Sequence, residues 1–220
     1  MPRTNLLDWA VRRLVIWLLV LGGGYLLVFG GSSTSKPIRK KISIEVATPS
    51  GTARGASVIE MVHSHAPWWY PAAVKGATSE RGEAPYADLG GRRYVFVTIN
   101  NQLDERPISG SLLPESIQAD GSFQPNRTPM IVTFGDIEDP NTIRKLEPGA
   151  FERAFGSGYR LVSLTATDTQ DPPTNGTLAQ KFPVLHRQLS MPAQQRVPQP
   201  YQRGDLRAIN WRAFETPPTP

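Results

Sequence analysis

Residues 86–99, YADLGGRRYVFVTI, carry the clearest fold signal in the chain. A short stretch that ends at Leu89 is followed by Gly90 and Gly91 and then by a run rich in β-branched and aromatic residues. Two adjacent glycines supply the positive φ values that a tight hairpin turn requires, and β-branched and aromatic side chains favour strands. The segment therefore predicts a β-hairpin with strands over residues 86–89 and 93–99.

Further strand patterns lie on both sides of this hairpin. Residues 42–47 alternate apolar and polar side chains, which is the period of a half-buried strand, and residues 56–62 predict its hairpin partner after a loop near residues 50–55. Residues 130–134 (MIVTF) and 159–167 (YRLVSLTAT) predict two more strands. The domain is expected to be mainly β, as a sandwich-like antiparallel arrangement.

One short helix is expected inside this domain, over residues 148–156. Pro148 suits a first helical turn, where its missing N–H costs nothing. Phe151 and Phe155 share one helix face at a spacing of four residues, and Gly156 can end the helix.

The composition limits the chemistry of the chain. Its 220 residues suit one domain with appendages. The 21 prolines and 19 glycines favour short elements joined by turns. The absence of cysteine excludes disulfides, thiolate metal sites and cysteine nucleophiles.

The net charge is +5, from 24 basic and 19 acidic residues. The basic residues gather on both sides of an N-terminal apolar run and in the C-terminal tail, and the middle of the chain is closer to balance. Because no nucleic-acid recognition motif accompanies them, nucleic acid is not expected as a partner.

Residues 14–31, LVIWLLVLGGGYLLVFGG, form that uncharged apolar run. Its length of about 16–18 residues is at the lower limit for spanning a hydrocarbon core. We expect a transmembrane signal-anchor helix, in which Gly22, Gly23 and Gly24 permit close packing against another helix. A cleaved signal peptide and a buried soluble helix are the alternatives.

The segment before this run is short and basic, and such an end commonly stays in the cytoplasm. We therefore expect a single-pass protein of the inner (cytoplasmic) membrane with its main domain in the periplasm. The expected organisation is a basic segment (1–13), a membrane helix (14–31), a linker (32–41), a β-rich domain (42–189) and an extended Pro/Arg-rich tail (190–220).

Parts of the chain resemble a group of uncharacterised bacterial membrane-anchored proteins. The resemblance rests on residues 44–51 (IEVATPSG), residues 57–60 (SVIE), residues 82–84 (GEA) and a stretch over residues 129–158 that includes PMIVTFGDIEDPNTIRKLEP. It covers roughly residues 42–185. The resemblance implies a membrane-anchored domain, and because the family has no established activity it supplies no catalytic residue.

An aromatic triplet bracketed by prolines is the most unusual local feature, and it suggests a rigid contact surface or rings that cap the core. Aromatic residues in the Arg-rich tail are expected to dock onto the domain or onto a partner. The candidate partner-binding residues are therefore Trp68, Trp69, Tyr70, Arg203, Arg207, Trp211 and Phe214.

Two groups of residues have a weaker claim to catalysis or metal binding. His63 and His65 share one strand face and could reach one metal ion, but a surface pair is the more common meaning of this spacing. Asp136, Glu138 and Asp139 follow a strand, where general acids and ligands of hard cations occur, but a solvated turn is the more common meaning of this pattern.

No motif reaches the level of a catalytic signature. The leading interpretation is a membrane-anchored accessory or interaction protein, a non-catalytic subunit or binding module without a cofactor. Its expected partners are the lipid bilayer and other membrane protein subunits. The alternative is a membrane-tethered hydrolase that uses residues 136–139 or the histidine pair.

Overall fold

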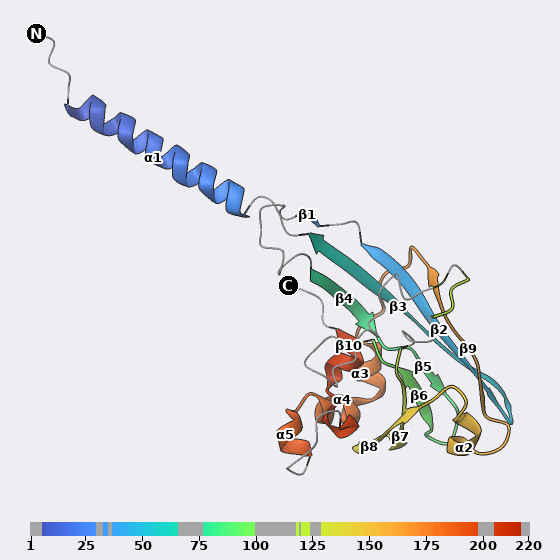
Figure 1. Ribbon diagram of the computed structural model, residues 1–220. Coiled ribbons are helices and arrows are strands. Elements are labelled where there is room, and N and C mark those ends of the chain that lie inside the picture. Colours follow the sequence, from blue (N-terminus) through green and yellow to red (C-terminus); the bar gives the residue numbers. More distant parts are fainter. Residues whose placement is uncertain are drawn as a thin grey trace, which may run out of the picture. The chain divides into compact units, whose positions relative to one another are not determined.

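The computed structural model describes residues 6–29, 33–34, 37–65, 77–99, 118, 120–123, 129–197 and 205–216 (Figure 1). The chain divides into two compact units. The first consists of Met1–Lys36 and Val62–Ser79, and the second of Pro37–Met61 and Glu80–Pro220.

The first unit contains the helix α1 (Leu6–Phe29) and the two-residue strand β1 (Ser33–Thr34). β1 pairs antiparallel with Ser64 and His65, at the end of strand β3 (Gly51–His65). Side chains of α1 are described for residues 13–24. Among the residues described to this level, no helix is both long and apolar enough to cross a membrane.

The second unit is built on two antiparallel sheets, so the expectation of a mainly β domain is confirmed. The larger sheet has the strand order β10-β4-β3-β2-β9, and the smaller one the order β5-β6-β7-β8. The strands of the larger sheet, besides β3, are β2 (Ile38–Thr48), β4 (Ala77–Glu83), β9 (Arg160–Asp168) and β10 (Glu215–Thr216). Those of the smaller sheet are β5 (Tyr86–Asp88), β6 (Tyr94–Val97), β7 (Ile131–Asp136) and β8 (Asp139–Leu146).

Both predicted hairpins form. β5 and β6 are joined by a turn in which Gly90 and Gly91 have φ values of +81° and +61°, as the glycine pair predicts. The β2–β3 turn is tighter than the expected loop near residues 50–55, because Thr48 pairs directly with Gly51. Gly51 has a φ of +137°, a value that favours glycine and that allows β3 to begin directly after the turn.

The two faces of the smaller sheet meet different partners. Val95 and Val97 belong to a cluster with Ile44 and Val46 of β2, which packs the two sheets together. Phe96, between those valines, lies on the opposite face. Its ring centroid is 5.3 Å from that of Phe182, in the helical region of the domain.

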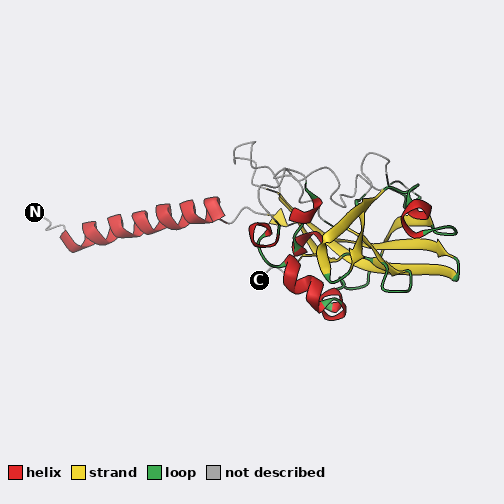
Figure 2. Ribbon diagram, turned by 90° about the horizontal axis from the view of Figure 1, so that it is seen from below, coloured by secondary structure: helices red, strands yellow, loops and turns green. Residues whose placement is uncertain are grey.

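The helical region comprises three short helices that lie close together (Figures 1 and 2). They are α3 (Thr177–Lys181), α4 (Pro183–Leu189) and α5 (Ala193–Arg196). The expected helix near residues 148–156 is present as α2 (Phe151–Phe155). The other three have no clear sequence pattern because each is too short for a periodic apolar stripe.

The C-terminal segment corrects the expectation of an extended tail over residues 190–220. It forms the single turns η3 (Leu206–Ala208) and η4 (Trp211–Ala213), and β10 then pairs with Glu83 and Gly82 of β4. Phe214 is fully buried. The apolar side chains of this Pro- and Arg-rich segment complete the core, so the domain includes described residues beyond its expected end at residue 189.

The two sheets approach each other closely at Gly55. A Cβ atom added there would stand 1.7 Å from the carbonyl oxygen of Tyr86 in β5. Backbone cannot retreat as a flexible side chain can, so this contact requires glycine.

Gly55→Ala is therefore expected to lower the free energy of unfolding by roughly 2–4 kcal/mol. Gly149→Ala is the matched control, because no atom lies within 4 Å of a Cβ placed there. Chemical denaturation of the two variants measures the difference. Equal stability of both would show that the sheets do not meet at Gly55.

Candidate functional site

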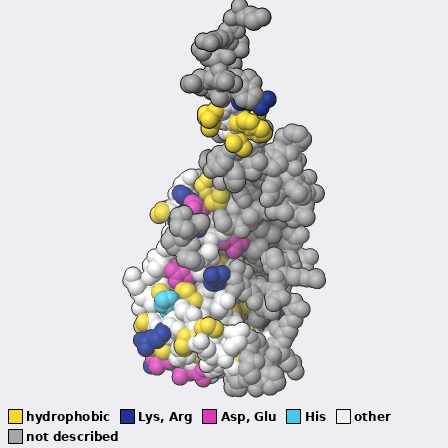
Figure 3. All heavy atoms as spheres, turned by 90° about the vertical axis from the view of Figure 1, so that its left-hand side faces the viewer, with side chains coloured by type: hydrophobic (Ala, Val, Ile, Leu, Met, Phe, Trp, Pro, Cys, Tyr) yellow, Lys and Arg dark blue, Asp and Glu magenta, His cyan; other side chains and the backbone are white. Residues whose placement is uncertain are grey.

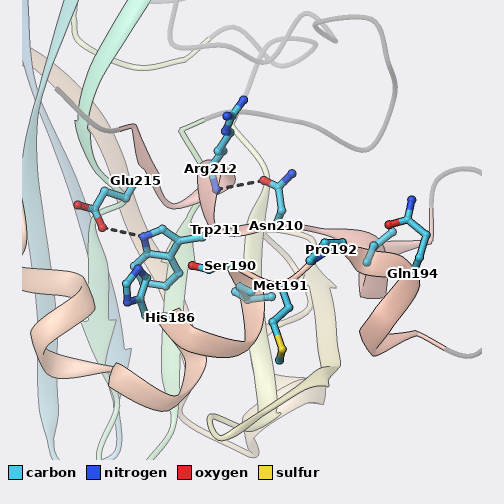
Figure 4. A pocket seen from close by; sticks show the side chains of 12 residues that line it. His186, Ser190, Met191, Pro192, Gln194, Asn210, Trp211, Arg212 and Glu215 are labelled. Atoms are coloured by element: carbon cyan, nitrogen blue, oxygen red, sulfur yellow. Dashed lines mark hydrogen bonds between the residues drawn. The ribbon is translucent and has the colours of Figure 1, made fainter. Parts of the chain in front are cut away.

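A groove of about 580 Å³ opens between the end of α4 and the C-terminal segment (Figure 4). One wall consists of the last turn of α4 and the residues up to Gln194 in α5. The other wall is formed by residues between Ala208 and Glu215. In the view of Figure 4, Glu215, Trp211 and His186 lie toward one end of the groove and Gln194 toward the other.

Arg196 joins these two walls. Its Nη2 donates to the carbonyl of Ile209 at 2.7 Å and its Nη1 to that of Arg207 at 3.1 Å. Its Nε donates to the carbonyl of Met191 at 3.4 Å. Burial lowers the pKa of Arg196 from its usual value. Three carbonyl groups accept from its guanidinium in this partly buried position.

Trp211 is held from two sides. Its indole Nε1 donates to Oε2 of Glu215 at 2.7 Å. The imidazole of His186 meets the indole edge-on, with 4.7 Å between the ring centroids. These contacts fix the orientation of both rings at the groove.

The charges that line the groove are few. Arg212 is exposed at its rim, and Glu215 is its carboxylate. Asn210 accepts from the backbone N–H of Arg212 through Oδ1 at 3.0 Å, which fixes the turn that carries the arginine. Among the described residues that line the groove, one side chain thus carries a formal positive charge and one a formal negative charge.

A second cavity of about 330 Å³ lies beside α3 and α4. Lys181 borders it and lies 4.9 Å from the ring centroid of Tyr86, while Arg92 is paired with Glu138. Burial acts to lower the pKa of Lys181, but hydrogen bonding to Tyr86 and nearby acidic groups raise it overall. Both cations are thus engaged within the chain.

A row of charges crosses three strands of the larger sheet. Glu60 in β3 has a side chain that is only 7 % exposed, and it pairs with Arg39 of β2 at 2.7 Å and with Arg81 of β4 at 3.6 Å. Two guanidinium groups compensate this buried carboxylate, as burial of a charge requires. The row ties the three strands together.

Glu83, at the end of β4, also joins two elements of the fold through its carboxylate. Its Oε2 accepts from the hydroxyl of Thr177 and from the backbone N–H of Leu178, the latter at 3.2 Å. The carboxylate thereby caps the first turn of α3, whose free N–H groups need an acceptor. This contact fixes the helical region against the larger sheet.

The predicted partner-binding residues fall into separate places. Trp68, Trp69, Tyr70 and Arg203 lie outside the described residues. Arg207 pairs with Asp205 at 2.6 Å, and Trp211 lines the groove. Phe214 is fully buried, so its side chain supports the fold and is closed to a partner.

Gly22, Gly23 and Gly24 lie in α1, where no atom of the described residues apart from the helix's own backbone is within 4 Å of a Cβ built at any of them. Their expected packing against a second helix stays a prediction.

The carboxylates considered for catalysis belong to the β7–β8 turn. Asp136 accepts from the backbone N–H of Glu138 at 3.0 Å, and Asp139 accepts from that of Asn141 at 2.9 Å. The side chains of His63 and His65, in β3, are outside the described part of the chain. Within the described residues, no group of three or more His, Asp or Glu side chains is placed to hold a metal ion.

Sequence reasoning missed the groove and most of its residues, including His186 and Glu215. One local signal was available in residues 205–212, DLRAINWR. Asp205 and Asn210 each accept the backbone N–H two residues later, at 3.0 Å, which is the Asx-turn pattern. This pattern predicts ordered turns in a segment that was expected to be an extended tail with docking aromatic residues.

Comparison with protein-family models finds no match to this chain, and searches of curated proteins and of solved structures find no significant match either.

Glu80 in β4 is a largely buried titratable group of the domain. Burial raises the pKa of its carboxyl from 4.5 to about 7. The folded state therefore keeps the proton between these two pH values, while the unfolded state releases it. The contribution of Glu80 to stability falls as the pH rises from 4.5 to about 7.

Glu80→Gln is expected to raise the free energy of unfolding at pH 8 by roughly 2–3 kcal/mol and to have much less effect at pH 4.5. Denaturation at both pH values measures this. Glu152→Gln, at an exposed position in α2, is the control and should change stability by less than ~0.5 kcal/mol at either pH. A pH-independent effect of Glu80→Gln would contradict the assignment.

Proposed function

We propose that this protein is a single-pass, membrane-anchored binding module. In this proposal α1 lies in the bilayer, and the β-rich unit presents the groove to a ligand or partner. The role is that of an accessory or interaction protein, a non-catalytic subunit in contact with other membrane proteins.

The observation that carries the proposal is the exposed apolar surface of α1. All eight consecutive residues from Leu14 to Leu21 are large and apolar, and their exposed fractions run from 47 % for Val15 to 71 % for Leu19. Figure 3 shows hydrophobic side chains on the described part of this helix. A helix that is apolar on all sides is stable when lipid or protein covers it, and water does not provide such a cover.

The apolar part of α1 is at the lower limit for a membrane span. Residues 14–29 correspond to about 24 Å at a rise of 1.5 Å per residue, against a hydrocarbon core of about 30 Å. Arg12 and Arg13 lie within its first turns, where long side chains can reach the interface. These basic residues favour a cytoplasmic N-terminus and hence a periplasmic domain in the inner membrane.

The carboxylates of the β7–β8 turn give little support to the alternative of a membrane-tethered hydrolase, because each is already engaged within the domain. Asp136 and Asp139 bond to the backbone of their own turn, and Glu138 pairs with Arg92. A general acid or base needs free access to its substrate. The groove is therefore the better candidate for the functional surface.

The anchor is tested by a charge placed in the apolar helix. Leu19→Arg in the full chain is expected to reduce the fraction that floats with liposomes by at least about tenfold, because an arginine near the bilayer centre costs ~2.5–3.5 kcal/mol. Flotation through a density gradient after alkaline washing measures that fraction.

Val162→Arg is the matched control, since Val162 is an exposed large apolar residue of the β-rich unit, 48 % exposed. It should float as the unchanged chain does. Equal flotation of Leu19→Arg and the control, or no flotation of the unchanged chain, would reject α1 as the anchor.

A further inference from the structure

We propose that Asn175, two residues before α3, is a modification site at which the folded chain deamidates without an enzyme and gains an isoaspartyl link. Water is the only co-reactant. An isoaspartyl link carries the backbone through the side chain and so lengthens it by one carbon atom. The modification therefore acts on the start of the helical region, and it depends neither on the membrane anchor nor on the groove.

The reaction takes place between Asn175 and the peptide nitrogen that follows it. Hydroxide removes the proton from the N–H of Gly176, and this nitrogen forms a bond to Cγ of Asn175. The Cγ–Nδ2 bond breaks, and the amide nitrogen leaves as ammonia with a proton from water. Water then opens the resulting cyclic imide, at the backbone carbonyl to give isoaspartate or at Cγ to give aspartate. The sum is the uptake of water and the loss of ammonia, and nothing is oxidised or reduced.

The first argument is the residue after the asparagine. Of the seven asparagines in the sequence, Asn175 alone is followed by glycine. A glycine has no Cβ to hinder the approach of its nitrogen to the side chain before it. The space around Gly176 is also open, because no atom of the described residues lies within 4 Å of a Cβ built there.

The second argument is that both reacting groups are accessible. The N–H of Gly176 donates to no acceptor among the described residues, so its proton is not held by a hydrogen bond within this part of the chain. Asn175 is exposed, and its Nδ2 donates to the carbonyl of Pro173 at 3.2 Å at the surface. Water and hydroxide therefore reach the site in the folded chain.

The third argument concerns the effect of the extra backbone atom, since the chain is held on both sides of Asn175. The N–H of Thr174 donates to the carbonyl of Val58 at 3.1 Å, and its Oγ1 accepts from the N–H of Val58 at 3.0 Å. The hydroxyl of Thr177 donates to the carboxylate of Glu83. A longer backbone between these two attachments has to displace one of them.

The modification is tested by incubating the full chain in detergent micelles at mildly alkaline pH. Peptide mass mapping over time measures the conversion of each asparagine, and labelling by an isoaspartyl methyltransferase identifies the isoaspartyl product. Asn175 is expected to convert at least about tenfold faster than Asn141, because the residue after Asn141 is the β-branched Thr142. Asn175→Gln is the matched variant and should remove the labelling at this position.

The structural consequence has its own measurement. The amide of Leu178 donates to the carboxylate of Glu83 at 3.2 Å, so its hydrogen exchange reports whether α3 remains attached. Exchange at Leu178 is expected to be faster in the isoaspartyl chain than in the unconverted chain. Asn175→Asp adds the same charge without the extra backbone atom and should keep the slow exchange.

Two results would overturn the proposal. One is conversion of Asn175 no faster than that of Asn141 in the folded chain, which includes the case in which Asn175 stays intact. The other is unchanged exchange at Leu178 in the isoaspartyl chain, because the added atom would then leave both attachments in place.

Discussion

The burial of Phe214 is the interaction on which the rest of the domain depends. Its ring packs against Phe96 of the smaller sheet, with the centroids 5.7 Å apart, and against Phe134 at 6.1 Å. The backbone carbonyls of Phe214 and of the residue before it also accept hydrogen bonds from the rest of the domain. The carbonyl of Phe214 accepts from the N–H of Ala84 at 2.7 Å, and that of Ala213 accepts from Ile99 at 2.9 Å. One residue near the end of the chain thus joins both sheets.

The groove is a consequence of this docking. Because Phe214 is fixed in the core, the turn before it places the largely buried Trp211 at the edge of the groove. Glu215 of β10 then lies within hydrogen-bond distance of the indole. Arg196 then ties the preceding residues to the helical wall. A buried aromatic side chain contributes several kcal/mol to stability, so the groove built on it is held in a fixed geometry. Under the proposed function, such preorganisation lowers the entropic cost of binding.

The elements that the sequence predicted depend on local signals, whereas the elements that it missed depend on contacts between residues far apart in the chain. The hairpin of β5 and β6 was predictable because Gly90 and Gly91 specify a local turn. The short helix at Phe151 was also predictable from local signals, namely the four-residue spacing of Phe151 and Phe155 and the glycine that follows at position 156. The C-terminal segment was not, because the residues that receive Phe214 lie 80 and 118 positions earlier, at Phe134 and Phe96. Composition described that segment as Pro- and Arg-rich, whereas long-range packing decides its structure.

Hydrogen exchange at the amides of Ala84 and Ile99 in the full chain tests this account most directly. Their acceptors are the carbonyls of Phe214 and Ala213, so their protection reports the docking of the C-terminal segment. Docking predicts that both amides exchange as slowly as that of Thr98, which donates to Met130 within the smaller sheet at 2.9 Å. Rapid exchange at Ala84 and Ile99 while Thr98 remains protected would contradict the docked segment and the groove that it forms.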